Sequence, residues 1–168
     1  MKIIELSNTE LKVLVDDEDF DRLSQYKWWG HNKTSKKEKE RGIKDRIYAE
    51  CKTKGKHYRM HRLILDCPKG LEIDHIDGNR LNNQKSNLRI VTHQQNLFNQ
   101  RMTYKDKFKG ISFHSRDKIY EARIRYNDHL YYLGRYTDPR AAALAYDFAA
   151  VYYFGEYACL NFKDGYIR

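Results

Sequence analysis

The second half of the sequence alternates between apolar and polar residues in three short runs and then gives way to one alanine-rich segment. The runs GISFH, IYEARIRY and LYYLGRY are joined by the turn-like sequences SRDK and NDH, a pattern typical of half-buried strands. The segment TDPRAAALAYDFAAVYYFG can be capped by Asp138 or Thr137, has Pro139 in its first turn, and can end at Gly155 in the left-handed conformation. These residues predict a three-stranded antiparallel sheet packed on one helix.

A change in composition separates this half from the first. Eleven of the 14 tyrosines follow residue 100, and the stretch NQRMTYKDKFKG (99–110) is polar and basic. A shift of this kind is typical of a domain boundary. We therefore expect one domain at 1–100, a linker at 101–107 and a second domain at 108–168.

The first half is predicted to be a mixture of short strands and helices. KIIELS and LKVLV flank the turn-like NTE and favour a β-hairpin. DDEDFDRLSQYKWW favours a short helix, because its acids stand in the first turn where the helix dipole stabilises them. RIYAECK and HYRMHRLIL are strand-like or mixed segments around the turn KTKGKH.

The charge distribution points to a polyanionic partner. The chain has a net charge of +9 and a pI near 9.4. Residues 1–30 are acidic, whereas residues 31–66 hold 12 Lys and Arg against 5 Asp and Glu. Clustered Lys and Arg neutralise phosphates, although charged stretches can also be ordinary solvated faces.

Cysteine usage and hydropathy exclude several classes of protein. Cys51, Cys67 and Cys159 are far apart, which argues against a zinc ribbon, a structural-metal adaptor or a disulfide framework. No apolar run approaches the length of a membrane span, and MKIIELSNTE lacks the apolar core of a signal peptide. We expect a cytoplasmic protein without membrane contact.

The stretch LEIDHIDGN carries the residues of greatest chemical interest. A strand through Ile73 would bring Asp74 and His75 to its end, and DGN would turn the chain. LRIV (88–91) is a plausible return strand, and Thr92 with Gln95 forms a capping-box pattern for a helix. Asn96 would then lie in the first turns of that helix, facing the hairpin.

Such an arrangement suits metal-assisted hydrolysis of a phosphodiester. Mg²⁺ prefers oxygen ligands, and Asp74 and Asn96 offer two of them. His75 has an ordinary pKa near neutrality and can take a proton from an attacking water. Asp-Gly and Asn-rich stretches are also common turns, so the residues alone leave a purely structural role open.

Residues 60–100 closely resemble the HNH nuclease family in its homing-endonuclease branch. The resemblance rests on the string DHIDGNRLNN…SNLRIVT…QN, and DDEDFDRLSQYKWW extends it over roughly residues 3–100. It implies a ββα-metal fold that cleaves DNA with one divalent ion, Mg²⁺ or Mn²⁺. Asp74 and Asn96 match the metal ligands, His75 matches the general base, and Asn87 matches the residue that ties the loop together and orients the base.

Two further histidines and one departure accompany this resemblance. His61 matches a histidine in the HRL sequence of these proteins and is either structural, which we favour, or near the phosphate. His93 either contacts the metal or phosphate or is simply solvated at the helix start, the account we favour. Asn96 stands where other branches have His, which argues against a zinc-like preference.

Residues 105–162 resemble the AP-two (ethylene-response-factor) type DNA-binding domain. The landmarks are KGI, EARI, YLGRY, AAALAYDFAA and FGEYACLNF, and the resemblance implies a sheet that enters the major groove with the helix behind it. Tyr120 and Tyr132 stand where the plant domains have Trp, and one residue is inserted in the first turn region. The plant sequence preference is therefore not carried over. The expected DNA-contacting residues are Lys109 on phosphate, with Ser112, His114, Arg116, Arg123, Arg125 and Tyr132.

Together these inferences predict an α+β protein with an N-terminal HNH ββα-metal nuclease module, followed by a small three-stranded antiparallel sheet packed on one helix. We expect a homing-type endonuclease that hydrolyses double-stranded DNA in a bacterial or phage-infected host cell. A monomer is the simplest expectation, because the chain has one catalytic constellation. The alternative is a non-catalytic, sequence-specific DNA-binding regulator that retains the nuclease fold.

Overall fold

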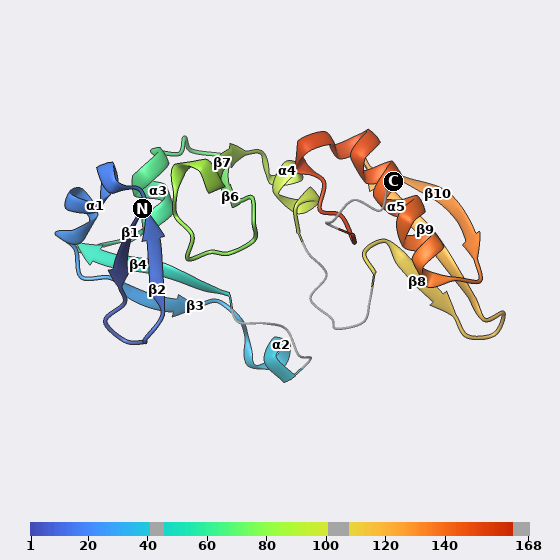
Figure 1. Ribbon diagram of the computed structural model, residues 1–168, viewed down its shortest axis with the longest axis horizontal. Helices are drawn as coiled ribbons and strands as arrows, with labels where there is room; N and C mark the ends of the chain where they lie inside the picture. Colours follow the sequence, from blue (N-terminus) through green and yellow to red (C-terminus); the bar gives the residue numbers. More distant parts are fainter. Residues whose placement is uncertain (41–45, 101–107, 163–168) are drawn as a thin grey trace. The chain divides into compact units, whose positions relative to one another are not determined.

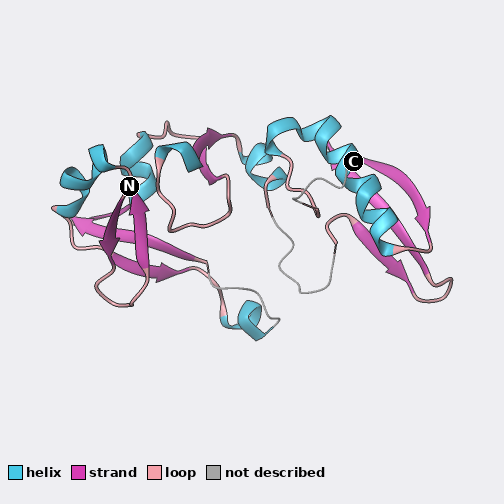
Figure 2. Ribbon diagram, in the orientation of Figure 1, coloured by secondary structure: helices cyan, strands magenta, loops and turns pink. Residues whose placement is uncertain are grey.

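The computed structural model describes residues 1–40, 46–100 and 108–162 of the chain. They form a mixed α+β protein with small antiparallel sheets (Figures 1 and 2). No described helix is long and apolar enough to cross a membrane. In chain order the elements are β1 Lys2–Glu5, β2 Lys12–Val15, α1 Asp17–Ser24, β3 Trp29–Asn32, α2 Lys36–Glu40, β4 Ile47–Thr53, β5 Lys56–Arg59, α3 Met60–Leu65, β6 Glu72–His75, η1 Lys85–Asn87, β7 Leu88–Val91, α4 His93–Phe98, β8 Ile111–His114, β9 Ile119–Tyr126, β10 His129–Tyr136, α5 Pro139–Phe154 and η2 Gly155–Tyr157.

The chain divides into two compact units, Met1–Asn96 and Leu97–Arg168. The division falls inside α4, so this helix contributes residues to both units. The expected linker at 101–107 lies outside the described residues. Each unit is built around its own apolar cluster.

The first unit contains the predicted hairpin β1–β2, the three-stranded sheet β3-β4-β5 and the hairpin β6–β7. Its core includes Val13, Leu23 and Met60, all fully buried. The predicted helix after the first hairpin ends at Ser24, because Trp28 is buried in this core and its indole N–H donates to the carbonyl of Leu23 at 2.8 Å. The residue that follows Trp28 begins β3, a strand that the sequence did not indicate.

The mixed segment HYRMHRLIL divides into two elements at one residue. Its first part pairs with β4 as strand β5, and Met60 then begins α3. Lys54 and Gly55, with φ of 47° and 74°, make the tight turn between β4 and β5. Two consecutive positive φ angles match the right-handed twist of paired strands.

The second unit is a three-stranded antiparallel sheet, ordered β10-β9-β8, with α5 packed on one face (Figure 2). The alternation in IYEARIRY predicts this arrangement, and Ala122 and Ile124 are indeed buried toward the helix cluster. Fully buried alanines on α5, such as Ala142 and Ala150, let the helix approach the sheet closely.

Helix α5 begins and ends where the sequence predicts, with one difference in backbone conformation. Asp138 is the N-cap, because its Oδ1 accepts a hydrogen bond from the Arg140 N–H at 2.9 Å. Gly155 ends the helix with a positive φ of 52°, as expected, but its ψ is −129°. The prediction of a left-handed helical conformation at Gly155 is therefore wrong in its ψ angle. The chain continues directly into the short helix η2.

Gly110 makes the closest backbone approach in the second unit. Its φ is +76°, and a Cβ at this position would lie 2.0 Å from Cδ2 of Tyr146 and 2.7 Å from the carbonyl oxygen of Arg123. The Gly110 carbonyl also accepts a hydrogen bond from the Arg123 N–H at 2.9 Å. Because Gly110 has no side chain, β9 and α5 can pack closely against the residue that precedes β8.

Gly110→Ala should lower the free energy of unfolding by about 3 kcal/mol, because overpacking adds to the strain of a positive φ. Gly55→Ala is the matched control. Its φ is +74° but nothing lies within 4 Å of the new Cβ, so only strain of about 1–2 kcal/mol is expected. Urea unfolding followed by circular dichroism gives both values, and equal losses would contradict the packing argument.

Candidate active site and nucleic-acid interface

The candidate active site is built on the β6–β7 hairpin and α4. β6 and β7 pair with Glu72 opposite Val91 and His75 opposite Leu88. The predicted capping box is present, since the Thr92 N–H donates to Gln95 Oε1 at 2.9 Å and the Gln95 N–H donates to Thr92 Oγ1 at 3.2 Å. In chain order, the two strands β6 and β7 are followed by the capped helix α4 (Figure 1).

Glu72 attaches α4 to the hairpin. Its carboxylate accepts a hydrogen bond from Asn96 Nδ2 at 2.5 Å and lies 2.9 Å from His93 Nδ1. The contacts with Asn96 and His93 hold the pKa of Glu72 below its ordinary value. Glu72 was missed by the sequence analysis, although its place two residues before Asp74 puts it on the same strand face.

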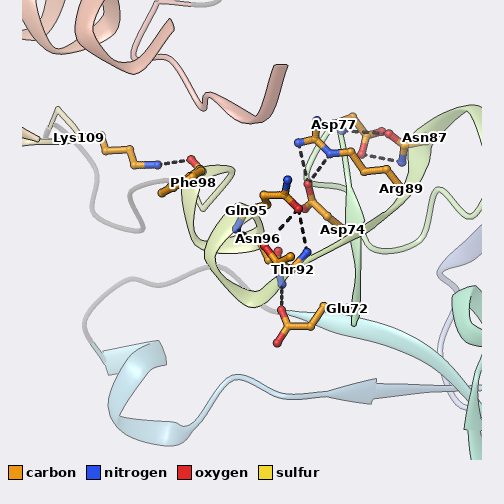
Figure 3. A network of polar contacts seen from close by, with 10 residues as sticks. All are labelled: Glu72, Asp74, Asp77, Asn87, Arg89, Thr92, Gln95, Asn96, Phe98 and Lys109. Carbon is orange, nitrogen blue, oxygen red and sulfur yellow. Dashed lines mark hydrogen bonds and ion pairs between the residues drawn. The ribbon is translucent and has the colours of Figure 1, made fainter. Parts of the chain in front are cut away.

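Asp74 makes a close ion pair with Arg89. Nε and Nη2 of Arg89 lie 2.9 and 2.8 Å from Asp74 Oδ2, and the two residues face each other across β6 and β7 (Figure 3). Asp74 is only 7% exposed. The arginine fixes the direction of the carboxylate and offsets the cost of burying its charge.

His75 leaves β6 on the opposite face from Asp74, as neighbours in a strand do. The His75 ring packs edge to face against the His61 ring, with 5.2 Å between the ring centroids. The centroid of the Tyr48 ring lies 6.5 Å from that of His75. Burial lowers the pKa of His75, although its hydrogen bond with Asn83 acts the other way. Burial also lowers the pKa of His61, to about 3, so the His61 ring is neutral at pH 7.

The amide that contacts the His75 ring is Asn83, which the sequence analysis did not single out. Asn83 Oδ1 lies 3.2 Å from His75 Nε2, and its Nδ2 donates to the carbonyl of Arg80. Asn83 is 1% exposed, and its backbone N–H donates to the carbonyl of Leu14 at 2.8 Å. Only its place in the Asn82–Asn83 pair of the turn could have indicated this role.

Asn87 ties together the loop between β6 and β7. Its Nδ2 donates to Asp77 Oδ1 at 3.0 Å and to the Asn82 carbonyl at 2.9 Å, while its Oδ1 accepts from the Asp77 N–H at 2.9 Å. Its own carbonyl accepts from the Ile76 N–H. These bonds organise the turn that follows His75, whereas the hydrogen bond to the His75 ring comes from Asn83.

The two residues expected to hold a metal, Asp74 and Asn96, carry the oxygen ligand types that a hard divalent cation takes. Asp74 supplies a carboxylate, and the Asn96 amide, whose nitrogen is directed to Glu72, supplies an oxygen at its other end. Among the described residues, no three His, Cys, Asp or Glu side chains gather into a metal cluster. Mg²⁺ binds through one or two protein oxygens and retains several waters, so the residues present fit such an ion.

His61 and His93 have different surroundings. His61 is buried on α3 between Tyr48 and His75. The side chain of His93 is 73% exposed at the start of α4, where it pairs with Glu72. The packing of His61 favours a structural role, and the exposure of His93 favours a solvated one.

In the second unit, five of the expected DNA-contacting residues lie on the outer face of the sheet. Ser112 stands opposite Glu121 and His114 opposite Ile119, while Tyr132 stands opposite Arg123. Alternation along β9 places Arg123 and Arg125 on the same face, away from Ala122 and Ile124. The shared face is therefore formed by Ser112, His114, Arg123, Arg125 and Tyr132.

The other two expected contacts lie elsewhere. Lys109 donates from Nζ to the carbonyl of Phe98 at 2.6 Å, and burial lowers its pKa (Figure 3). The ammonium thus binds the C-terminal turn of α4 rather than facing outward, which corrects its expected place on a phosphate. Arg116 is exposed in the turn between β8 and β9.

A second basic face lies on the sheet β3-β4-β5 of the first unit. Glu50, buried in β4, is 2.6 Å from His31 Nδ1 and 3.2 Å from Arg59 Nε. Burial raises the pKa of Glu50, but His31 and Arg59 outweigh it and the pKa lies below the ordinary value. The guanidiniums of Arg59 and Arg80 lie 5.0 and 5.5 Å from the ring centre of Tyr48. Residues 41–45 of the basic 31–66 stretch lie outside the described residues.

Comparison with known proteins finds relatives among nucleases. An uncharacterised HNH endonuclease of Acanthamoeba polyphaga mimivirus is 36% identical over 110 residues, covering 64% of this chain and 57% of that protein. The prophage protein YosQ of Bacillus subtilis, named as an HNH homing endonuclease, is 46% identical over 54 residues, covering 29% and 31%. The DNA endonuclease I-HmuI of Bacillus phage SP01 is 44% identical over 52 residues, covering 28% and 30%.

These matches are partial. The chain spans 57% of the length of the mimivirus protein and about a third of the other two relatives. No solved structure matches the chain. Residues 66–97 match the model of the HNH endonuclease family, and this segment contains Asp74, His75, Asn87 and Asn96.

Proposed function

We propose that the protein is a homing-type DNA endonuclease that hydrolyses phosphodiester bonds with one divalent metal ion. The observation that carries this proposal is the HNH match over the segment that forms the β6–β7 hairpin and most of α4. The names of the phage and prophage relatives, which are DNA and homing endonucleases, support a DNA substrate. Their origins also support a place in a bacterial or phage-infected cell.

Asp74 and Asn96 are the residues proposed to hold the metal. Glu72 orients the Asn96 amide, and Arg89 orients the Asp74 carboxylate. When bound, Mg²⁺ or Mn²⁺ supplies stabilisation of negative charge on the phosphate and on the leaving oxygen. Arg89, which contacts one oxygen of the Asp74 carboxylate, is proposed to add positive charge near the bound phosphate.

His75 is the proposed general base, and its hydrogen bond selects the reacting nitrogen. Asn83 directs its amide nitrogen to the Arg80 carbonyl, so its oxygen accepts a hydrogen bond that the Nε2–H of His75 donates. The neutral ring then carries its lone pair on Nδ1, the atom that would take a proton from water. Asn87 contributes by holding the loop in which Asn83 and Asp77 lie.

The outer face of the β8–β10 sheet is proposed to bind the DNA target in the manner of the AP-two type domain. A strand face that presents Arg123, Arg125 and Tyr132 suits the major groove, where arginine binds guanine edges in pairs. The cationic and aromatic face around Tyr48 and Arg59 in the first unit suits phosphate contacts that do not depend on sequence. The proposal also assigns residues 1–100 to a nuclease domain and residues 108–168 to a DNA-binding domain.

His75→Ala should reduce metal-dependent cleavage of supercoiled plasmid by about 10²–10⁴-fold, the range for loss of a general base. Conversion to open-circular or linear DNA in Mg²⁺, Mn²⁺ or EDTA measures it. His129→Ala, which changes an exposed histidine of the second unit, is the control. If folded wild type and His75→Ala both bind but do not cut a library of genomic fragments, the DNA-binding regulator replaces the nuclease.

The double variant Arg123→Ala/Arg125→Ala should weaken binding to the selected target by about tenfold or more, because base contacts are lost. Non-specific nicking at low salt should persist, since the nuclease residues and the basic face on β3-β4-β5 of the first unit are unchanged. Gel-shift titration and plasmid nicking measure the two properties. Loss of all nicking in a folded double variant would overturn this division of labour.

A further inference from the structure

Glu121 is a buried acid on the sheet face that carries Arg123, Arg125 and Arg135. It lies near the middle of β9, the central strand, and is 2% exposed. Its neighbour Ala122 packs toward α5, so alternation places Glu121 on the opposite, outer face. A carboxylate in this position cannot itself reach a base.

The carboxylate makes ion pairs with basic side chains from all three strands. His114 of β8 has Nε2 3.7 Å from Oε2, and Arg135 of β10 has Nε 3.5 Å from the same oxygen. Arg123 of β9 pairs with Oε1 through Nη2. The three basic side chains are 42–58% exposed. The acid therefore lies beneath two partly solvated guanidiniums and an imidazole.

The pKa of Glu121 depends on its contacts with these three basic side chains. Burial raises the pKa of Glu121, but Arg123, His114 and Arg135 outweigh this effect and the pKa lies below the ordinary value. A charged acid at this place attracts the guanidiniums toward it and limits their rotamers before any ligand arrives. Side chains that are already ordered lose less entropy when they bind.

We propose that Glu121 is a positioning residue for target recognition by the sheet, and that Arg135, which it holds near Arg123, is a further DNA-contacting residue. This inference rests on the proposed DNA-binding function of the sheet. Arginine distinguishes guanine only when its planar fork is correctly aimed. The negative charge of Glu121 also opposes phosphates of any sequence, so it sacrifices general affinity in favour of discrimination.

The test measures discrimination with the full-length protein in EDTA, so that no cleavage occurs. Wild type first selects duplexes from a random-sequence library, and affinities are then measured for one selected duplex and for its scrambled version. Glu121→Gln removes the charge with little change in shape. Glu156→Gln, in the exposed helix η2, raises the net charge by the same amount and is the matched control.

Glu121→Gln should lower the ratio of selected to scrambled affinity by about tenfold, comparable with loss of one well-oriented arginine contact. Affinity for the scrambled duplex should stay equal or rise, whereas a merely structural role would lower both affinities together. Glu156→Gln should leave the ratio unchanged. In an Arg123→Ala/Arg135→Ala background, Glu121→Gln should have no further effect on the ratio, because both of the arginines that it orients are gone.

Suppose that folded Glu121→Gln keeps the wild-type ratio of selected to scrambled affinity, while Arg123→Ala/Arg125→Ala loses affinity for the selected duplex. The positioning role is then overturned, and the sheet remains the DNA-binding surface. Full target affinity in Arg123→Ala/Arg125→Ala overturns both proposals. If Glu121→Gln does not fold by circular dichroism, the exposed substitution Arg135→Ala decides. A lowered ratio then supports the proposal, and an unchanged one overturns it.

Discussion

The buried amide of Asn87 links the two strands of the candidate active site through hydrogen bonds to the intervening loop. Its nitrogen donates to Asp77 and to the Asn82 carbonyl, and its oxygen accepts from the Asp77 backbone. Amide hydrogen bonds that are buried are costly to leave unmade, so the turn has little freedom. That rigidity fixes where β6 ends, and hence where Asp74 and His75 are presented.

Buried carboxylates paired with cations recur in both units. Asp74 pairs with Arg89, Glu50 with Arg59, and Glu121 with Arg123 on the outer face of the second sheet. In a chain of net charge +9, these acids reduce local repulsion between cations that must stay close together. Each pair leaves the guanidinium at least partly solvated, so attraction for polyanions is retained.

Much of the secondary structure could be predicted from the sequence, because local patterns determine it. The alternation of IYEARIRY and the N-cap residue of α5, Asp138, depend on neighbours in the chain, and both are confirmed. Contacts between distant segments were harder to predict. Asn83 bonds the His75 ring and Lys109 bonds the Phe98 carbonyl through tertiary packing that no local pattern encodes. Glu121 escaped notice because an acid in an alternating strand usually marks a solvated face.

The contacts of Leu14 have a consequence for how such a module could be exchanged between genes. Leu14 in β2 accepts the Asn83 N–H and donates to the Leu81 carbonyl, so the amide that orients His75 is anchored to the first hairpin. The segment that matches the nuclease family begins only at residue 66. A recombination event that moved that segment alone would separate the histidine from its anchor. The shortest segment that contains both the candidate site and this anchor therefore begins no later than β2.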